Sequence, residues 1–255
     1  MRKLITYISY LFEYIKFGDL TSVFNAIYYV VNNKSLPSDR VIRTSTGVFF
    51  TRGGTNDFQF ANHNYEKNIK DFILSSFKDG FTHFFDIGTC IGEHSIYASH
   101  TGLKAYAFEA IPQNARVFRL NMDLNNTYED ITFYNHALGS CNEVGQFFYE
   151  PVNTGASRRV YGEKAISVSI RPFDDIFDEL YFPYSTKSLF KIDVEGMELE
   201  VLSGAKQTLR MIDDVRLIIE DKFDDQKSIE GFLKSIGNFD FERLDEYNVI
   251  ATKRK

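Results

Sequence analysis

The chain has 255 residues, of which 44% are hydrophobic and 25% charged, and its formal net charge is −6. This composition is that of a globular protein and excludes a disordered or fibrous chain, and the length allows a large core without disulfides or metals. The acidic balance argues against a protein whose main task is to grip the phosphates of nucleic acids.

The first 33 residues have apolar side chains at helical spacing and predict two amphipathic helices. Their start, MRKLITYISYLF, resembles a signal peptide, but Glu13 and Lys16 interrupt the apolar run and no small-residue cleavage site follows. The uncharged stretch from Leu20 to Asn33 is shorter than the roughly 18 residues that span a bilayer, so no transmembrane segment is predicted. Packing on the main body is the simpler expectation, and docking on a membrane surface or a partner is the alternative.

Aromatic residues make up 16% of the chain and fall into two groups. Phenylalanines on the expected core strands are explained by packing. A group of tyrosines lies in the N-terminal helices, at Tyr7, Tyr10, Tyr14, Tyr28 and Tyr29. These rings either pack the helices, stack against sugar rings or face a second copy of the chain, and we expect any homo-oligomer to form through these helices.

The chain contains two cysteines, Cys90 and Cys141. Two are too few for a disulfide framework, and their spacing is not that of metal ligands. A reducing compartment is the simplest setting, so we expect a cytoplasmic protein.

A polar break, NNKSLPSDR, follows the two helices. The sequence therefore predicts an N-terminal helical appendage over residues 1–40 and one domain over residues 41–255. That domain begins, in chain order, with a strand pair, a polar stretch and a helix, at 41–43 and 48–52, 52–57 (RGGTND) and 64–78.

Strands and helices alternate from residue 81 onward. We expect strands at 81–88, 103–109, 131–138, 188–194 and 215–220, and helices at 93–100, from Pro112, at 197–211 and at 226–236. Extra strands are expected at 144–149 and 166–170, around the loop PVNTGASRRVYGEK, and a hairpin turns at 245–248. The alternation predicts an α/β fold with a mostly parallel sheet, covered by helices on both faces and extended by a terminal antiparallel hairpin.

The first strand of the alternation runs into the loop Asp86-Ile-Gly88-Thr-Cys-Ile-Gly92. Ligands of such sheets bind at the carboxyl ends of the strands, where glycines allow close approach. A dinucleotide site would need the spacing G-x-G-x-x-G, which this loop lacks, and Asp86 would repel a pyrophosphate. A carboxylate there suits S-adenosylmethionine, which carries positive charge and no phosphate.

Glu109 ends the next strand, 23 residues after Asp86. A carboxylate in this place accepts hydrogen bonds from ribose hydroxyls. The two acidic residues together, at this spacing and in this topology, therefore predict a cofactor site rather than two unrelated polar strand ends.

These residues and the segment from Lys191 to Ala205, which reads K-I-D-V-E-G and then E-x-x-V-L-x-G-A, resemble the FkbM family of S-adenosylmethionine-dependent methyltransferases. The resemblance covers about residues 47–222, and RGGTND is similar to an R-x-G-T-x-D stretch of many members. It implies the Rossmann-like class I methyltransferase fold, with a seven-stranded sheet whose last pair is reversed. It also implies methyl transfer to oxygen, commonly to a hydroxyl of a sugar, a glycan or a related small metabolite.

The resemblance further implies where the cofactor binds. Thr89 stands where the family usually has Asn. The residues expected to contact S-adenosylmethionine are Asp86, Gly88, Thr89, Gly92, Glu109, Ala110, Asn135, His136, Ala137 and Asp193.

Three charged residues of the KIDVEG segment are the expected catalytic group. Alignment of acceptor, methyl carbon and sulfur supplies much of the catalysis, and a general base assists a sugar hydroxyl. Asp193 or Glu195 is expected to accept the proton, with Lys191 holding the carboxylate. The alternative is that Lys191 and Glu195 form only a structural ion pair. Glu220, at the end of the next strand, is a second candidate base for which a structural role is preferred.

Other polar residues give weaker indications. His94 and His136 are each better explained as structural than as catalytic. Carboxylates such as Asp57, Glu66 and Asp193 suit a divalent cation, but their spacing specifies none, so no metal is predicted. The arginine pair at 158–159 either binds an anionic acceptor or belongs to a solvated loop.

Four functions were compared on this basis. A sugar or small-molecule O-methyltransferase with no nucleic-acid partner is preferred. An RNA methyltransferase is disfavoured, because Asp-Val-Glu-Gly stands where base-methylating enzymes have an [N/D]-P-P-[Y/F] signature. The first glycine loop disfavours an oxidoreductase. A non-catalytic module that binds S-adenosylmethionine stays open.

Overall fold

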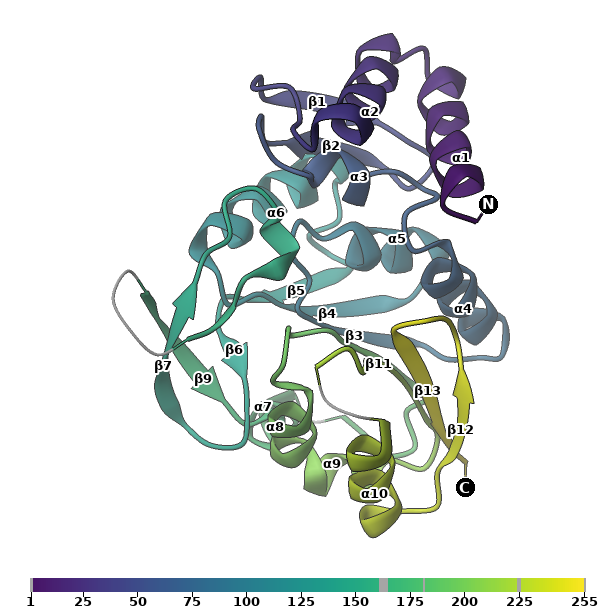
Figure 1. The fold of residues 1–255 in the computed structure, drawn as a ribbon. Coiled ribbons are helices and arrows are strands. Elements are labelled where there is room, and N and C mark those ends of the chain that lie inside the picture. The colour runs from purple at the N-terminus through teal and green to yellow at the C-terminus, as the bar shows by residue number, and fades with distance from the viewer. Residues whose placement is uncertain (1, 161–164, 181, 224–225, 255) are drawn as a thin grey trace.

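The computed structural model describes residues 2–160, 165–180, 182–223 and 226–254, with side chains from residue 7 onward (Figure 1). Its centre is a seven-stranded sheet in the order β12-β13-β11-β10-β3-β4-β5. The strands are β3 (His83–Ile87), β4 (Lys104–Phe108), β5 (Ile131–Tyr134), β10 (Ser188–Ile192), β11 (Val215–Glu220), β12 (Asp240–Arg243) and β13 (Asn248–Lys253). β13 pairs antiparallel with both β11 and β12, which confirms the terminal hairpin.

Helices cover both faces of this sheet, as the alternation predicted (Figure 1). One face carries α4 (Lys67–Lys78), α5 (Glu93–Thr101) and α6 (Pro112–Asn125); the other carries α7 (Phe173–Leu180), α8 (Glu198–Gly204), α9 (Lys206–Met211) and α10 (Gln226–Ile236). Successive strand residues alternate between the two layers, so Phe84 packs in one apolar cluster and Phe85 in the other. The phenylalanines of the strands therefore fill the core.

A second sheet stands beside the first, in the order β6-β9-β7-β8. It consists of β6 (Ala137–Leu138), β7 (Glu143–Phe148), β8 (Arg158–Arg159) and β9 (Ile166–Arg171). The single strand expected at 131–138 is therefore wrong: it breaks at Asn135, whose Nδ2 donates to the Glu109 carbonyl, and Ala137 then pairs with Ile170.

Three smaller expectations also change. The helix expected at 197–211 is two helices separated at Ala205. The loop PVNTGASRRVYGEK contains a 3-10 turn (Thr154–Ala156) and β8, and its residues 161–164 lie outside the described part of the chain. Neither α7 nor the short α3 (Asp57–Phe60) was expected.

The N-terminal helices α1 (Arg2–Lys16) and α2 (Leu20–Asn32) pack side by side at one end of the molecule, next to the antiparallel pair β1 (Arg40–Arg43) and β2 (Val48–Thr51) (Figure 1). The Tyr14 hydroxyl donates to the carbonyl of Phe58, and Asn62 Nδ2 donates to the carbonyl of Tyr10, which ties α1 to the chain around α3. Within the described residues, no helix is long and apolar enough to cross a membrane. The division of the chain at residue 40 stays a prediction.

Candidate active site

The loop after β3 is organised by Asp86, which is fully buried. Its Oδ2 accepts hydrogen bonds from Thr89 Oγ1 at 2.7 Å and Ser95 Oγ at 2.6 Å, which draws the loop onto the first turn of α5. Burial raises the pKa of Asp86, and Lys191 is the largest influence opposing that rise. Asp86 thus holds the loop from beneath.

The two glycines of this loop are required by their surroundings. Gly88 has φ +87°, and a Cβ there would lie 1.8 Å from the Asp193 carbonyl oxygen, on the neighbouring strand end. Gly92 has φ +90°, and its Cβ would overlap the ring of Phe118 on α6. Glycine is therefore needed both for the backbone conformation and for close packing.

Glu109 follows β4 and is held by two backbone N–H groups. Oε2 accepts from Cys90 at 2.9 Å and Oε1 accepts from Ile111 at 2.6 Å. Burial raises the pKa of Glu109 to about 7, against the lowering effect of these two hydrogen bonds. The carboxylate keeps lone pairs for further donors, as ribose hydroxyls would supply.

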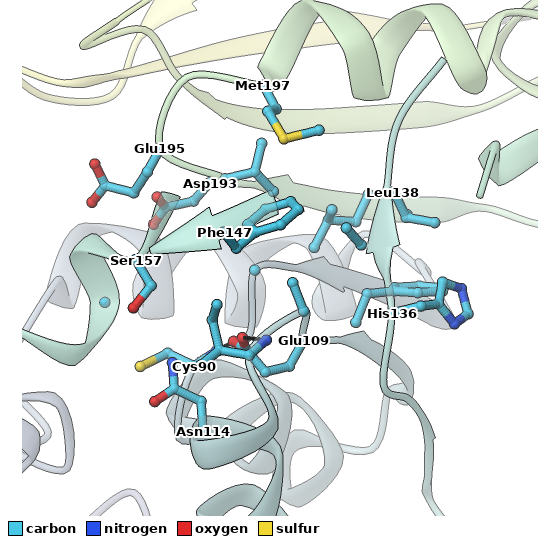
Figure 2. A pocket seen from close by; sticks show the side chains of 18 of the residues that line it. Cys90, Glu109, Asn114, His136, Leu138, Phe147, Ser157, Asp193, Glu195 and Met197 are labelled. Carbon is cyan, nitrogen blue, oxygen red and sulfur yellow. Dashed lines mark hydrogen bonds between the residues drawn. The ribbon is translucent and has the colours of Figure 1, made fainter. Parts of the chain in front are cut away.

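A narrow cavity lies between Glu109 and the end of β10. Figure 2 shows Glu109 and Cys90 on one side, Asp193 and Glu195 on the opposite side, and Phe147 reaching in between. Apolar side chains line much of the wall, including Ile111, Leu138, Phe147 and Met197. One end is therefore suited to a flat apolar ring, and the Glu109 end to hydroxyl groups.

The predicted cofactor residues divide between this cavity and its supports. Gly88, Glu109, Ala110, His136, Ala137 and Asp193 line it. The other four lie behind the wall: Asp86, Thr89, Gly92 and Asn135. Burial lowers the pKa of His136 to about 4, so its imidazole is neutral; the ring packs against Phe108 and Tyr134 and turns away from the cavity in Figure 2.

The predicted catalytic residues form ion pairs at the end of β10. Lys191 Nζ lies 2.7 Å from Asp193 Oδ2, and Lys222 Nζ lies 3.3 Å from Glu195 Oε2. Burial alone would lower the pKa of Lys191, but Asp193 and then Asp86 outweigh burial and raise it, so the lysine is charged. Lys191 therefore pairs with Asp193 and not with Glu195.

Glu220, at the end of β11, joins this group. Asp193, Glu195 and Glu220 each offer an oxygen, and these oxygens all lie within 4.8 Å of one another. Glu220 Oε2 is buried without a hydrogen-bond partner in the described structure. Burial, followed by the charges of Asp193 and Glu195, raises the pKa of Glu220 to about 8.

A second, wider cavity continues from the first and shares Gly88, Cys90, Gly155, Asp193 and Glu195 with it. Aromatic rings from four separate segments line it: Tyr29, Phe60, Tyr65 and Tyr247. Its charged lining residues are Glu66, Glu93, Asp193, Glu195, Glu220, Lys191 and Lys222. Carboxyl groups thus outnumber cations in this cavity.

Glu66 and Glu93 line the deep side of the wider cavity, beside His94 and Lys70. His94 Nε2 lies 3.5 Å from Glu66, and burial lowers the pKa of His94 well below its usual value, so the ring is neutral. Burial raises the pKa of Glu66 to about 7 and that of Glu93 to about 8. Glu93 Oε2 is buried and lacks a hydrogen-bond partner in the described part of the chain.

Backbone strain gathers around the two cavities. Five non-glycine residues in the described chain have positive φ, and three of them, Glu66, Cys90 and Glu195, line the cavities. Such conformations typically cost about 1–3 kcal/mol and accumulate at functional sites. Burial raises the pKa of the Cys90 thiol well above its usual value, which makes it a poor nucleophile.

The RGGTND stretch closes one side of the site. Arg52 grips Asp57 through Nε at 2.7 Å and Nη2 at 2.9 Å, and Asp57 also accepts a hydrogen bond from Thr154 Oγ1. Asn56 Oδ1 accepts from the Thr154 backbone N–H. The stretch therefore clamps the 3-10 turn whose Thr154 and Gly155 line the narrow cavity.

Two alternatives from the sequence are corrected by these contacts. Asp57 is occupied by Arg52, so it does not converge with Glu66 and Asp193 on a cation. Arg159 is bound to Glu200 at 2.9 Å and Glu143 at 3.1 Å, so it ties the second sheet to α8.

Several lining residues were not found from the sequence. Glu93 follows Gly92 directly, and Met197 follows the KIDVEG motif, so both had a local signal. Phe147, Thr154, Ser157, Tyr29, Tyr65 and Tyr247 had none, because each comes from a segment without a motif.

Comparison with known proteins agrees with this architecture. Residues 86–247 match the sequence profile described as the methyltransferase FkbM domain. No curated protein sequence matches the chain.

Solved structures resemble the chain at low sequence identity. The methyltransferase FkbM from Methylobacillus flagellatus KT is 16% identical with a TM-score of 0.49; the match covers 76% of this chain and 53% of that one, so this chain spans about half its length. A SAM-dependent methyltransferase from Agrobacterium tumefaciens is 8% identical with a TM-score of 0.50, over 86% and 71%. An rRNA methylase from Streptococcus thermophilus is 10% identical with a TM-score of 0.44, over 73% and 95%. At these identities the similarity concerns the fold, which is that of class I methyltransferases.

Proposed function

The chain belongs to the FkbM family of methyltransferases, and from this premise we propose that it methylates a hydroxyl oxygen of a sugar or a related small metabolite. The narrow cavity is the proposed cofactor site and the wider cavity the proposed acceptor site. The observation that carries the proposal is that the two cavities meet at Gly88, Asp193 and Glu195.

The narrow cavity fits S-adenosylmethionine, the methyl donor of the family. Glu109 would accept hydrogen bonds from the ribose, while Phe147 and Met197 would enclose the adenine. A side chain at Gly88 would collide with Asp193, so the bare loop is what leaves room for a ligand. Glu93, with its unpartnered oxygen, is the proposed partner of the cofactor's ammonium group. When bound, S-adenosylmethionine supplies an electrophilic methyl group on a sulfonium.

The wider cavity supports a polyhydroxylated acceptor. Aromatic rings such as Tyr29, Tyr65 and Tyr247 offer faces for sugar rings, and carboxyl groups accept hydrogen bonds from hydroxyls. A free phosphate or a nucleic-acid backbone would meet five carboxyl groups there and two lysines, both of which are already ion-paired. This charge balance disfavours RNA as the acceptor, and a nucleic-acid partner is not proposed.

The base that receives the hydroxyl proton is proposed among the carboxylates at the end of β10 and β11. Asp193 lines both cavities, and Lys191 holds its carboxylate in place. Glu220 has no cation in direct contact through its unpartnered oxygen and has a raised pKa, so it is the stronger base of the group. We assign proton acceptance to Asp193 or Glu220, with Glu195 fixing the loop through Lys222.

The proposed setting is the cytoplasm, because both cysteines are unpaired; Cys90 is buried and Cys141 is exposed.

Incubation with methyl-labelled S-adenosylmethionine and a panel of saccharides, polyols, RNA and protein tests the function. We expect label in a saccharide or polyol product; label only in RNA would contradict the proposal. Calorimetry should show binding of S-adenosylmethionine and its demethylated product but not of NAD. Cofactor binding without transfer to any acceptor of the panel would instead favour a non-catalytic binding module.

A further inference from the structure

The polarity of helix α2 is inverted relative to that of an ordinary surface helix. Its buried residues are Ser22, Asn25 and Ala26. Its exposed side includes large apolar side chains at helical spacing, namely Leu20, Phe24, Ile27, Val30 and Val31, and the exposed fraction reaches 71% at Leu20 and 75% at Val31. A helix packed on a protein body normally buries its apolar side.

Helix α1 extends the same apolar surface. It exposes Ile8, Phe12 and Ile15, with Phe12 67% exposed, and buries Glu13. A groove between the two helices is lined by apolar side chains of both, including Leu11, Ile27 and Val31. We call the eight exposed residues of α1 and α2, from Ile8 to Val31, the outer apolar face.

Specific hydrogen bonds fix this orientation. Asn25 Oδ1 accepts from the Leu36 backbone N–H at 2.8 Å, and Glu13 Oε1 accepts from the Ser45 N–H. Asp19 caps α2 through Ser22 and forms an ion pair with Arg40 at 2.7 Å. Rotating either helix to bury its apolar side would leave these polar groups without partners, so the outer apolar face needs an apolar environment from elsewhere.

Charge identifies that environment. Residues 1–40 contain five basic and three acidic residues, a balance of +2 in a chain of net −6. Each of the three acidic side chains is engaged: Glu13 by Ser45, Asp19 by Arg40, and Asp39 by the Gly53 N–H. We propose that the outer apolar face docks on a lipid bilayer with anionic headgroups, with Phe12, Phe24 and Val31 entering the interface and the basic residues of the appendage meeting the headgroups.

A second copy of the chain would fit less well. Symmetric pairing through the same face would bring two positively charged appendages together, whereas an anionic surface attracts them. The same placement would also bring the acceptor cavity close to the lipid, because Tyr29 of α2 lines that cavity. The docking proposal itself does not depend on which acceptor is methylated.

The test is sedimentation of the full chain with sucrose-loaded vesicles of phosphatidylcholine alone or of phosphatidylcholine with 30% phosphatidylglycerol. We expect binding to the mixed vesicles, at least tenfold weaker binding for the double variant Phe24→Ser/Val31→Ser, and several-fold weaker binding for Lys34→Gln. Val144→Ser removes an equally exposed apolar side chain on β7 and should bind like the unmodified chain. Calorimetric binding of S-adenosylmethionine by every variant verifies the fold.

Three results would overturn the proposal. The unmodified chain fails to sediment with either vesicle, or Val144→Ser loses as much binding as the double variant, or the two vesicle types bind equally. Sedimentation velocity without lipid adds a fourth: a dimer that Phe24→Ser/Val31→Ser dissociates would make a second copy the occupant of the face.

Discussion

The backbone N–H of Cys90 donates to Glu109 Oε2 at 2.9 Å, which joins the glycine loop after β3 to the end of β4. The Cys90 backbone is in the left-handed region, with φ +51°, and this turns its N–H toward the carboxylate. Because Ile111 holds the other oxygen, Glu109 is oriented before any ligand arrives. The cofactor cavity is therefore preorganised by the backbone on both sides of one side chain.

Replacement of Glu109 tests this arrangement. Glu109→Ala removes the proposed acceptor of the ribose hydroxyls and leaves two backbone N–H groups without a partner. Hydrogen bonds to a charged group contribute about 1.5–3 kcal/mol each, so the affinity for S-adenosylmethionine should fall at least tenfold. Calorimetry measures this, with the exposed Glu129→Gln as control. Unchanged affinity would remove Glu109 from the cofactor site.

Gly88→Ala should disrupt the loop. Its Cβ would lie 1.8 Å from the Asp193 carbonyl oxygen and would sit at φ +87°. We expect loss of measurable cofactor binding and a lower melting temperature. Gly231→Ala on α10 is the matched control, because nothing lies within 4 Å of its Cβ, and it should stabilise the helix by about 0.5–1 kcal/mol. Equal behaviour of the two variants would contradict the assigned role of Gly88.

Asp193→Asn should reduce turnover. The substitution keeps the size of the side chain but removes the charge that pairs with Lys191 at 2.7 Å. General bases contribute about 10²–10⁴-fold, so a loss of that order in kcat is expected for methyl transfer, with Glu242→Gln on β12 unaffected. An unchanged kcat would exclude Asp193 from the mechanism.

Glu220 should determine the pH dependence of the reaction. A base acts in its deprotonated form, and burial raises the pKa of Glu220 to about 8. The value of kcat should therefore rise with pH up to about 8 and then level off. Glu220→Gln should lower kcat and abolish this inflection, while Glu220→Asp keeps a rise with pH. If the inflection persists in Glu220→Gln, another group is the titrating base.

Stability in the absence of cofactor should fall as the pH rises from about 6.5 to 8. Burial raises the pKa of Glu66 and Glu109 to about 7 and that of Glu93 to about 8, so the folded chain binds protons there that the unfolded chain has already released. Proton uptake on folding stabilises the folded state at lower pH and is lost as the pH passes these values.

Thermal unfolding at several pH values measures this effect. Glu93→Gln cannot take up that proton, so its melting temperature should depend less on pH than that of the unmodified chain or of Glu129→Gln. A melting temperature of the unmodified chain that rises over this interval would contradict the shifted carboxyl groups.

The sequence alone was sufficient for the central sheet and its ligand-binding edge. Buried runs such as FTHFFDIG and SLFKIDV mark parallel strands, and the glycines of the first loop mark the turn between β3 and α5. These signals are local, because periodicity, turn chemistry and glycine requirements are set by neighbouring residues. Asp86, Glu109 and Asp193 were predicted for the same reason: each ends a recognisable strand.

Only the tertiary structure decided what surrounds that edge. The wider cavity joins Tyr29, Tyr65, Glu220 and Tyr247, which lie far apart in the chain and have no shared motif. The inverted polarity of α2 depends on contacts such as that of Asn25 with Leu36, which no helical periodicity contains. Burial by distant segments likewise raises the pKa values of Glu93 and Glu220. The strands follow from local patterning, whereas the acceptor cavity and the outer apolar face arise from long-range packing.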